Sequence, residues 1–164
     1  MRSPISATTA ASTPADVEQV RILFLEYAAS LGFSLCFQGF DAELAGLPGA
    51  YAPLLGRLLL ARVDGVAAGC VGLRPIEDGV CEMKGLFVRP EFHGQGLGRK
   101  LAVAIIDEGS AAGYRAMRLD TVSSMKAAFG LYRSLGFQDI PQYRENPIAG
   151  VRYLELRLAM AATL

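Results

Sequence analysis

Three observations on the 164-residue sequence predict an α/β fold built on a mixed sheet. Apolar residues repeat at helical spacing over residues 13–32, and the pattern changes to short apolar runs joined by turn-forming residues over 57–88. From residue 80 onward a strand, a helix, a strand, a helix and a strand follow one another. An apolar fraction of 52% and a charged fraction of 20% are ordinary for a compact domain, so we expect residues 1–164 to form a single one.

The first element is an amphipathic helix. Thr13 and Pro14 are predicted as its N-cap and first helical residue. Apolar side chains then recur at helical spacing, namely Val17, Val20, Phe24, Tyr27 and Leu31. Residues 1–12 are rich in Ser, Thr and Ala, and fit either a frayed tail or a first edge strand. A second, shorter helix is predicted within residues 37–48.

A three-stranded antiparallel meander follows these helices. Two groups of turn residues, at 64–65 and 77–79, each end in Gly and are strong hairpin signals. The strands that they join are predicted over 57–63, 66–73 and 80–88. The rest of the chain is predicted as a helix from about 96 to 112, a strand over 115–121, a helix over 124–135 and a closing strand over 151–158.

Composition and charge exclude several classes of function. The formal net charge is zero, which argues against general nucleic-acid binding, although residues 84–133 carry a local excess of cations that suits a localised anion. His93 is the only histidine and the cysteines are odd in number, so neither a metal site nor a disulfide framework is expected. The longest apolar runs are far shorter than the roughly 20 residues that cross a bilayer. We expect a cytoplasmic protein that binds neither membrane nor nucleic acid.

The segment 93-HGQGLGRK-100 joins the end of a predicted strand to the start of a predicted helix. Glycines let backbone N–H groups at a helix start turn toward one point, and those groups bind phosphate. Arg99 and Lys100 add to the partial positive charge of these N–H groups. The spacing fits neither a Rossmann fingerprint nor a P-loop. The segment therefore predicts a pyrophosphate cradle, and a glycine-rich turn without a ligand is the alternative.

Two stretches, 81-CEMKGLFV-88 followed by the glycine loop and 128-AFGLYRSLGF-137, resemble the GNAT (GCN5-related N-acetyltransferase) superfamily over about residues 57–158. The chain is similar to its small, single-domain, bacterial-type members. The resemblance implies a mostly antiparallel central sheet flanked by helices on both faces, and acetyl-CoA as co-substrate, with no metal. The residues that it assigns to the coenzyme are Leu86, Phe87, Val88, His93, Gly94, Gln95, Gly96, Leu97, Gly98, Arg99, Met125 and Tyr132.

The sequence departs from the family pattern at two positions. Where the glycine motif usually begins with Arg or Gln, this chain has His93, which leaves the backbone cradle but weakens one phosphate contact. Where many members have Asn at the start of the second helix, this chain has Met125. That polar contact is missing unless Ser123 or Ser124 replaces it.

The resemblance also suggests catalytic residues. Tyr132 occupies the position of a tyrosine that lies beside the coenzyme sulfur and protonates the leaving thiolate; packing on its own helix is the alternative. Glu82 has the spacing from His93 at which histone-acetylating members carry their base. Alternatively, Glu82 faces solvent or pairs with Arg74 across the hairpin. The backbone N–H of Val88 is a candidate for polarising the thioester carbonyl.

The acceptor pocket is expected to be formed by two stretches of the chain, residues 36–44 and 141–150. The candidates are the aromatic residues Phe37, Phe40 and Tyr143, which could wall the pocket, and the polar residues Asp41, Glu43 and Asn146, which could bind a cation or an amine. For Phe37 and Phe40 the hydrophobic core is the favoured alternative, since apolar pairs at helical spacing usually lie there.

The prediction is an N-acetyltransferase that moves an acetyl group from acetyl-CoA to a primary amine of a small molecule, amino acid or peptide. The transfer is expected to be a direct attack in a ternary complex. A protein-lysine acetyltransferase is the neighbouring alternative. A non-catalytic acyl-CoA sensor and a purely structural domain are alternatives from other classes. Homodimers are frequent in families of this kind.

Overall fold

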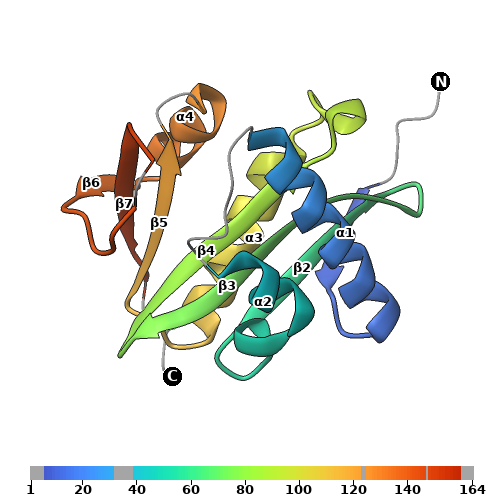
Figure 1. Ribbon diagram of the computed structural model, residues 1–164, viewed down its shortest axis with the longest axis horizontal. Coiled ribbons are helices and arrows are strands. Elements are labelled where there is room, and N and C mark those ends of the chain that lie inside the picture. Colours follow the sequence, from blue (N-terminus) through green and yellow to red (C-terminus); the bar gives the residue numbers. More distant parts are fainter. Residues whose placement is uncertain (1–5, 32–38, 123–124, 147, 160–164) are drawn as a thin grey trace.

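The computed structural model describes residues 6–31, 39–122, 125–146 and 148–159. A seven-stranded sheet runs through it in the order β1-β2-β3-β4-β5-β7-β6 (Figure 1). Its strands are β1 (Ser6–Ala10), β2 (Arg57–Val63), β3 (Val66–Glu77), β4 (Val80–Val88), β5 (Ala116–Val122), β6 (Gln138–Ile140) and β7 (Val151–Arg157). All pairs are antiparallel except β4 with β5, which confirms the mixed, mostly antiparallel sheet.

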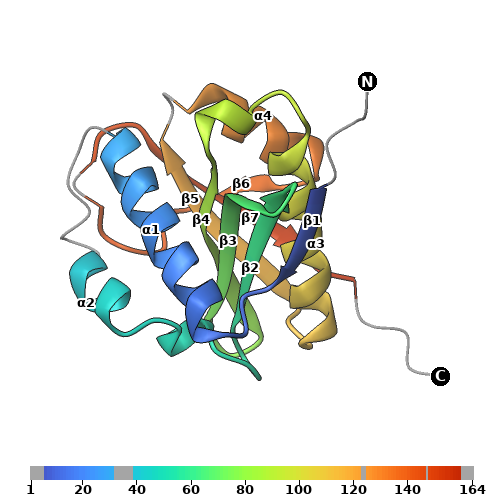
Figure 2. The ribbon, with the colours of Figure 1, turned by 90° about the vertical axis from the view of Figure 1, so that its right-hand side faces the viewer.

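Helices cover both faces of the sheet (Figure 2). Helices α1 (Pro14–Leu31) and α2 (Phe40–Ala45) lie on one face, and α3 (Leu97–Ala111) lies on the other. Helix α4 (Lys126–Ser134) packs into the same core cluster as α3, through Tyr132. Short 3₁₀ turns at Gly49–Tyr51 and Pro90–Phe92 precede β2 and the glycine loop. The two larger apolar clusters are separate because each helical layer buries its apolar stripe against its own face of the sheet.

Local signals placed most of these elements correctly. Thr13 caps α1, its hydroxyl oxygen accepting a hydrogen bond from the backbone N–H of Asp16 at 3.1 Å. The hairpin turns at 64–65 and 78–79 lie where they are predicted, and Asp64 and Gly65 both adopt positive φ. Strand β3 extends four residues beyond its predicted end at residue 73, and α2 is shorter than predicted. Two of the residues predicted to begin α2, 37 and 38, lie outside the described residues.

The sheet edges are where prediction was incomplete. Of the two alternatives for the N-terminal segment, the structure shows an edge strand, because Ser6–Ala10 pairs with β2. Strand β6 was not predicted; its three residues pair with β7, the next strand of the chain. No helix within the described ranges is long and apolar enough to cross a membrane.

The single parallel pair determines where a site can form. Its ladder joins only Val80–Ala116, Cys81–Met117 and Glu82–Arg118. Beyond Glu82, β4 departs from β5 and carries a bulge, since Cys70 faces Phe87 whereas Gly72 faces Lys84, three residues earlier on β4. Gly85 lies in this bulge at φ +66°, and an added Cβ there would come within 2.4 Å of the Phe24 ring. The bulge therefore turns β4 away from β5 and opens the sheet at its centre.

Candidate active site

A cleft lies between the separated ends of β4 and β5. It encloses about 830 Å³, including the open solvent at its mouth, and its walls come from α1, α2, β4, β5, α4 and the segment before β7. Residues predicted for the coenzyme and residues predicted for the acceptor line this same space. The coenzyme set contributes Leu86, Met125 and Tyr132, and the acceptor set contributes Phe40, Glu43 and Asn146.

The glycine loop leaves the N-terminus of α3 exposed and open. Gly94 and Gly96 adopt φ of +81° and +76°, and Gly96 is the N-cap of α3 with no side chain capping the helix. A Cβ placed on either glycine would meet no atom within 4 Å. The first backbone N–H groups of a helix lack intrahelical partners and attract anions. The loop therefore leaves open space in front of backbone N–H groups that suit an anion.

Side chains around the loop hold it in place. The ring Nε2 of His93 lies 2.8 Å from the backbone oxygen of Val88, so the residue that departs from the family pattern ties the loop to the end of β4. Arg99 donates to the Ser134 hydroxyl at 2.7 Å and Lys100 to the Ser6 hydroxyl at 3.1 Å. Gln95 is exposed and Leu97 is buried against Ala68 and Val63.

Tyr132 enters the cleft from α4. Its ring packs edge-on against Phe137 with centroids 5.7 Å apart, and the residue is only 8% exposed. Burial raises the pKa of Tyr132 above its usual value of 10. A phenol in this setting stays protonated at neutral pH and can donate a proton or a hydrogen bond. Both the packing contact and the place in the cleft are present, so the two alternatives for this residue are compatible.

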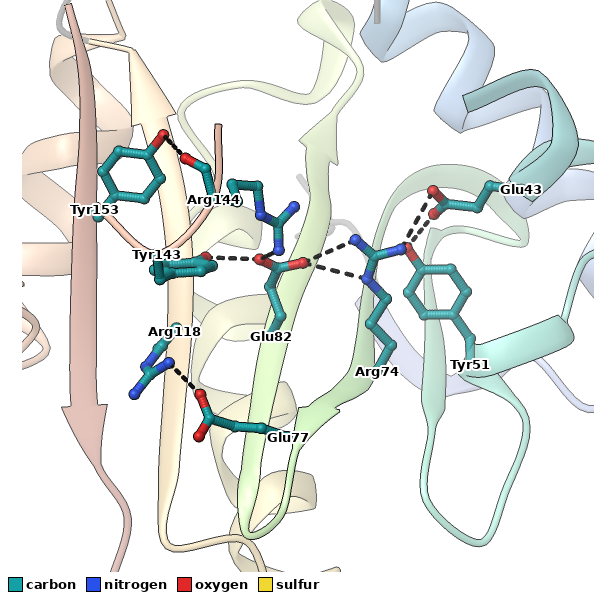
Figure 3. Close-up of polar contacts among 9 residues, drawn as sticks. All are labelled: Glu43, Tyr51, Arg74, Glu77, Glu82, Arg118, Tyr143, Arg144 and Tyr153. Atoms are coloured by element: carbon teal, nitrogen blue, oxygen red, sulfur yellow. Dashed lines mark hydrogen bonds and ion pairs between the residues drawn. The ribbon is translucent and has the colours of Figure 1, made fainter. Parts of the chain in front are cut away.

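Glu82 is the centre of a buried polar network (Figure 3). Its side chain is 0% exposed. Arg74 donates to Oε1 through Nη2 at 3.0 Å and Nε at 3.2 Å. On the other side, Tyr143 donates its hydroxyl to Oε2 at 2.6 Å, and Arg144 also donates to Oε2. The predicted pairing with Arg74 across the hairpin is therefore confirmed.

The network continues on both sides of Glu82. Toward α2, Arg74 lies 3.7 Å from Glu43, which also accepts a hydrogen bond from the hydroxyl of Tyr51. Toward β7, the rings of Tyr143 and Tyr153 pack edge-on with centroids 5.1 Å apart. Figure 3 shows Glu82 between these two groups, with Arg74 on one side and the 143–144 segment on the other.

The electrostatics of Glu82 follow from this arrangement. Burial alone would raise its pKa, but the positive charges of Lys84 and Arg144 and the donated hydrogen bonds outweigh burial and lower the pKa below 4.5. Both carboxylate oxygens already accept hydrogen bonds. Glu82 is thus a stable anion that orders two arginines, and its basicity is reduced.

The remaining acceptor candidates are distributed unevenly. Phe40 and Asn146 line the cleft, and Asn146 Oδ1 accepts a hydrogen bond from the backbone N–H of Ile148 at 3.0 Å. Asp41 is exposed at the start of α2 and does not line the cleft. Tyr143 supports Glu82 instead of forming a cleft wall. Phe37 lies outside the described residues, as do Ser123 and Ser124, the predicted substitutes for the missing Asn.

Two polar residues of this region were missed by the sequence reasoning. Arg144 was passed over because its loop has no periodic pattern, yet it donates to Glu82, 62 residues away in sequence. Asp120 was counted only as part of a strand, yet it lines the cleft. Its neighbours in the sequence, Leu119 and Thr121, form no pattern that distinguishes a cleft residue from a solvent-facing strand residue.

The described part of the chain contains no group of three or more His, Cys, Asp or Glu side chains that could hold a metal ion. Cys70 and Cys81 are buried free thiols, and Cys36 lies outside the described residues.

The chain is similar to proteins of known family. The family model described as acetyltransferase (GNAT) family matches its residues 27–137. An uncharacterised N-acetyltransferase of Schizosaccharomyces pombe is 40% identical, over 92% of this chain and 94% of its own length.

Two solved structures share the fold. A GNAT-family acetyltransferase of Staphylococcus aureus superposes with a TM-score of 0.77 at 17% identity, covering 94% of this chain and 100% of its own. The yncA protein of Salmonella typhimurium, solved with its cofactor acetyl-CoA, superposes with a TM-score of 0.66 at 21% identity, covering 96% of each chain.

Proposed function

Since the chain belongs to the GNAT acetyltransferase family and is therefore an acyltransferase that uses acetyl-CoA, we propose that it acetylates a primary amine of a small molecule, amino acid or peptide. The observation that supports this most directly is the cleft between β4 and β5. It contains residues predicted for the coenzyme and for the acceptor, with Tyr132 among them. An amine and a thioester that meet there can react by direct attack in a ternary complex.

The coenzyme is held, in this proposal, by the glycine loop and the end of β4. The backbone N–H groups from Gly94 to Arg99 bind the pyrophosphate at the start of α3, and residues 86–88 of β4 hydrogen-bond the pantetheine arm. Support comes from the positive φ of two loop glycines and from the uncapped helix start. Acetyl-CoA supplies the activated acetyl group and a thiolate leaving group.

Tyr132 is proposed as the acid that protonates this thiolate. Its raised pKa keeps the phenol protonated, and the edge-on contact with Phe137 fixes the direction of the ring. The backbone N–H of Val88 is proposed to polarise the thioester carbonyl as the second stabilising group.

An amine acceptor must lose a proton before it attacks. For an alkyl amine at pH 7 this costs roughly 4.6 kcal/mol, from a reference pKa of about 10.4. Glu82 was predicted as the base for this step. Both oxygens of Glu82 already accept hydrogen bonds and its pKa is lowered, so it is poorly suited to be the base. We propose instead that the carboxylate fixes Arg74 and Arg144 at the wall of the site. We propose that water takes the proton along a path ordered by this network.

Calorimetric titration of acetyl-CoA, followed by thiol release with a panel of amines, amino acids and peptides, tests the function. Binding with release by one acceptor supports the proposal. Release only with lysine-containing proteins would favour a lysine acetyltransferase. Binding without any release across the panel would favour the acyl-CoA sensor. A homodimer and a cytoplasmic location stay predictions, to be checked by light scattering and by fractionation of the source cells.

A further inference from the structure

One carboxylate in the cleft takes no part in the site described above. Asp120 lies on β5, and its Oδ2 is buried without a hydrogen-bond partner among the described residues. The cleft contains a second carboxylate, Glu43, but that group is already engaged with Tyr51 and Arg74. A buried carboxylate oxygen without a donor is costly, by about 1–3 kcal/mol or more. Such a group takes its missing donor from an ordered water, an ion or a ligand.

The position of Asp120 follows from the sheet register. The parallel ladder ends at the pair Glu82–Arg118. Because strand residues alternate between faces, Asp120 is the next residue of β5 on the face of Arg118. It is therefore the first residue on that face beyond the point where β4 departs, at the inner end of the opening.

The surroundings of Asp120 are aromatic and apolar, with charges on several elements. Burial and the negative charge of Asp120 raise the pKa of Tyr27 to about 12. Lys84 of β4 is the cation that lines the same cleft. The titratable groups whose ionisation responds to the charge of Asp120 come from four elements or segments: Tyr27 of α1, Tyr132 of α4, Tyr143 and Arg144 of the loop before β7, and Tyr153 of β7.

We propose that Asp120 binds the amino group of the acceptor, and that the acceptor is a primary amine carried on an apolar body. An ammonium group offers three N–H donors and a positive charge, which satisfy the buried oxygen. The walls beside it, Phe24, Tyr27, Phe40 and Leu119, suit a hydrocarbon or an aromatic ring. Tyr132 lines the same cleft, so an amine bound to Asp120 would share that space with the proposed acid.

This role rests on the proposed acetyltransferase function and deepens it by naming the acceptor class. Glu82 and Asp120 then have different tasks. Glu82, with both oxygens occupied, orders the wall of the site, whereas Asp120 lines the cleft and its Oδ2 has no donor. Asp120 is a binding residue here, and its removal should change acceptor affinity while coenzyme affinity stays the same.

The test uses 2-phenylethylamine as probe and 2-phenylethanol as its neutral isostere. Each is titrated by calorimetry into the full-length protein saturated with coenzyme A, which lacks the acetyl group and so permits no turnover. We expect the amine to bind wild-type protein at least tenfold more tightly than the alcohol. This comparison needs no variant. No measurable binding of the amine, or equal binding of the two probes, would overturn the proposed acceptor class.

The second arm uses Asp120→Asn, with Asp107→Asn on the exposed face of α3 as a matched control. We expect Asp120→Asn to weaken 2-phenylethylamine binding at least tenfold, to leave coenzyme A affinity unchanged, and to keep or raise the melting temperature, since Oδ2 has no hydrogen bond to lose. Asp120→Glu should restore part of the affinity. Unchanged amine affinity in a folded Asp120→Asn protein overturns the role of Asp120. Failure of the wild-type protein to bind coenzyme A would instead contradict the acetyltransferase proposal itself.

Discussion

A change at Gly96 tests the phosphate cradle through charge alone. Gly96 is exposed, caps α3 at φ +76°, and has open space where a side chain would begin. Asp and Asn have nearly the same volume, and both tolerate positive φ better than most residues. The pair Gly96→Asp and Gly96→Asn therefore shares backbone strain and bulk, and the two variants differ by one negative charge.

The size of the effect follows from where residue 96 lies. A carboxylate on the N-cap would lie at the helix start, where the pyrophosphate is proposed to bind. Two unit charges 4 Å apart repel by about 1 kcal/mol in water and about 4 kcal/mol at an effective dielectric constant of 20. An exposed loop falls between these limits. We therefore expect Gly96→Asp to bind coenzyme A at least tenfold more weakly than Gly96→Asn, or about 1.4 kcal/mol.

Stability should change in the opposite direction. A carboxylate near the N-terminus of α3 interacts favourably with the helix dipole, by about 0.3–1 kcal/mol, so Gly96→Asp should melt no lower than Gly96→Asn. The assay is calorimetric titration of coenzyme A at low and high salt, with a thermal melt of each variant. The affinity gap should narrow at high salt because the charges are exposed. Equal affinities of the two variants at low salt would refute the phosphate-binding role of the loop.

Three further changes test separate parts of the site and fold. Tyr132→Phe keeps the packed ring but removes the proton donor, so kcat should fall at least tenfold with little change in coenzyme affinity by calorimetry; an unaltered kcat would exclude the acid role. Because the folded-state pKa of Glu82 lies below 4.5, its ionised form stabilises the fold above that pH, and this contribution is lost as pH falls through the lowered pKa. Urea titrations between pH 3 and 7 should therefore show a shallower loss of stability on acidification for Glu82→Gln than for wild type, and parallel pH profiles would contradict the assigned direction. Gly85→Ala combines positive φ with a 2.4 Å approach to Phe24, so it should lower the free energy of unfolding by about 2 kcal/mol. The control Gly130→Ala in α4 meets nothing within 4 Å and should be neutral or stabilising. Equal melting temperatures for the two variants would show that the bulge tolerates a side chain.

Much of the fold could be predicted because its signals are local. The N-cap at Thr13, the positive-φ turn at residues 64–65 and the glycine loop at 93–98 each depend on a few neighbouring residues. The predicted strands of the meander begin where the structure has them, and only β3 runs on past its predicted end. Strand β6 could not be found in this way, because a three-residue strand exists only through its partner.

The candidate site shows the same division. The sequence indicated Tyr132 and the glycine loop through motif spacing, and it named Glu82 with pairing to Arg74 as one alternative. It did not indicate that Arg144 would share the same carboxylate, because those residues meet only after β7 has added to β5. Similarly, nothing in the order of residues showed that Asp41 would face solvent while Asp120 would face the cleft.

The sequence by itself determined the order of helices and strands, the turns between them and the glycine loop, since backbone conformation and hydrophobic periodicity are set by near neighbours. The tertiary structure decided where β4 leaves β5, which carboxylate is fully paired and which one has a buried oxygen without a donor. Those properties depend on strand register and on contacts between residues more than 60 positions apart, such as Glu82 with Tyr143. Strand register depends on many weak contacts across the whole sheet. It is therefore a property of the folded chain and cannot be read from neighbouring residues.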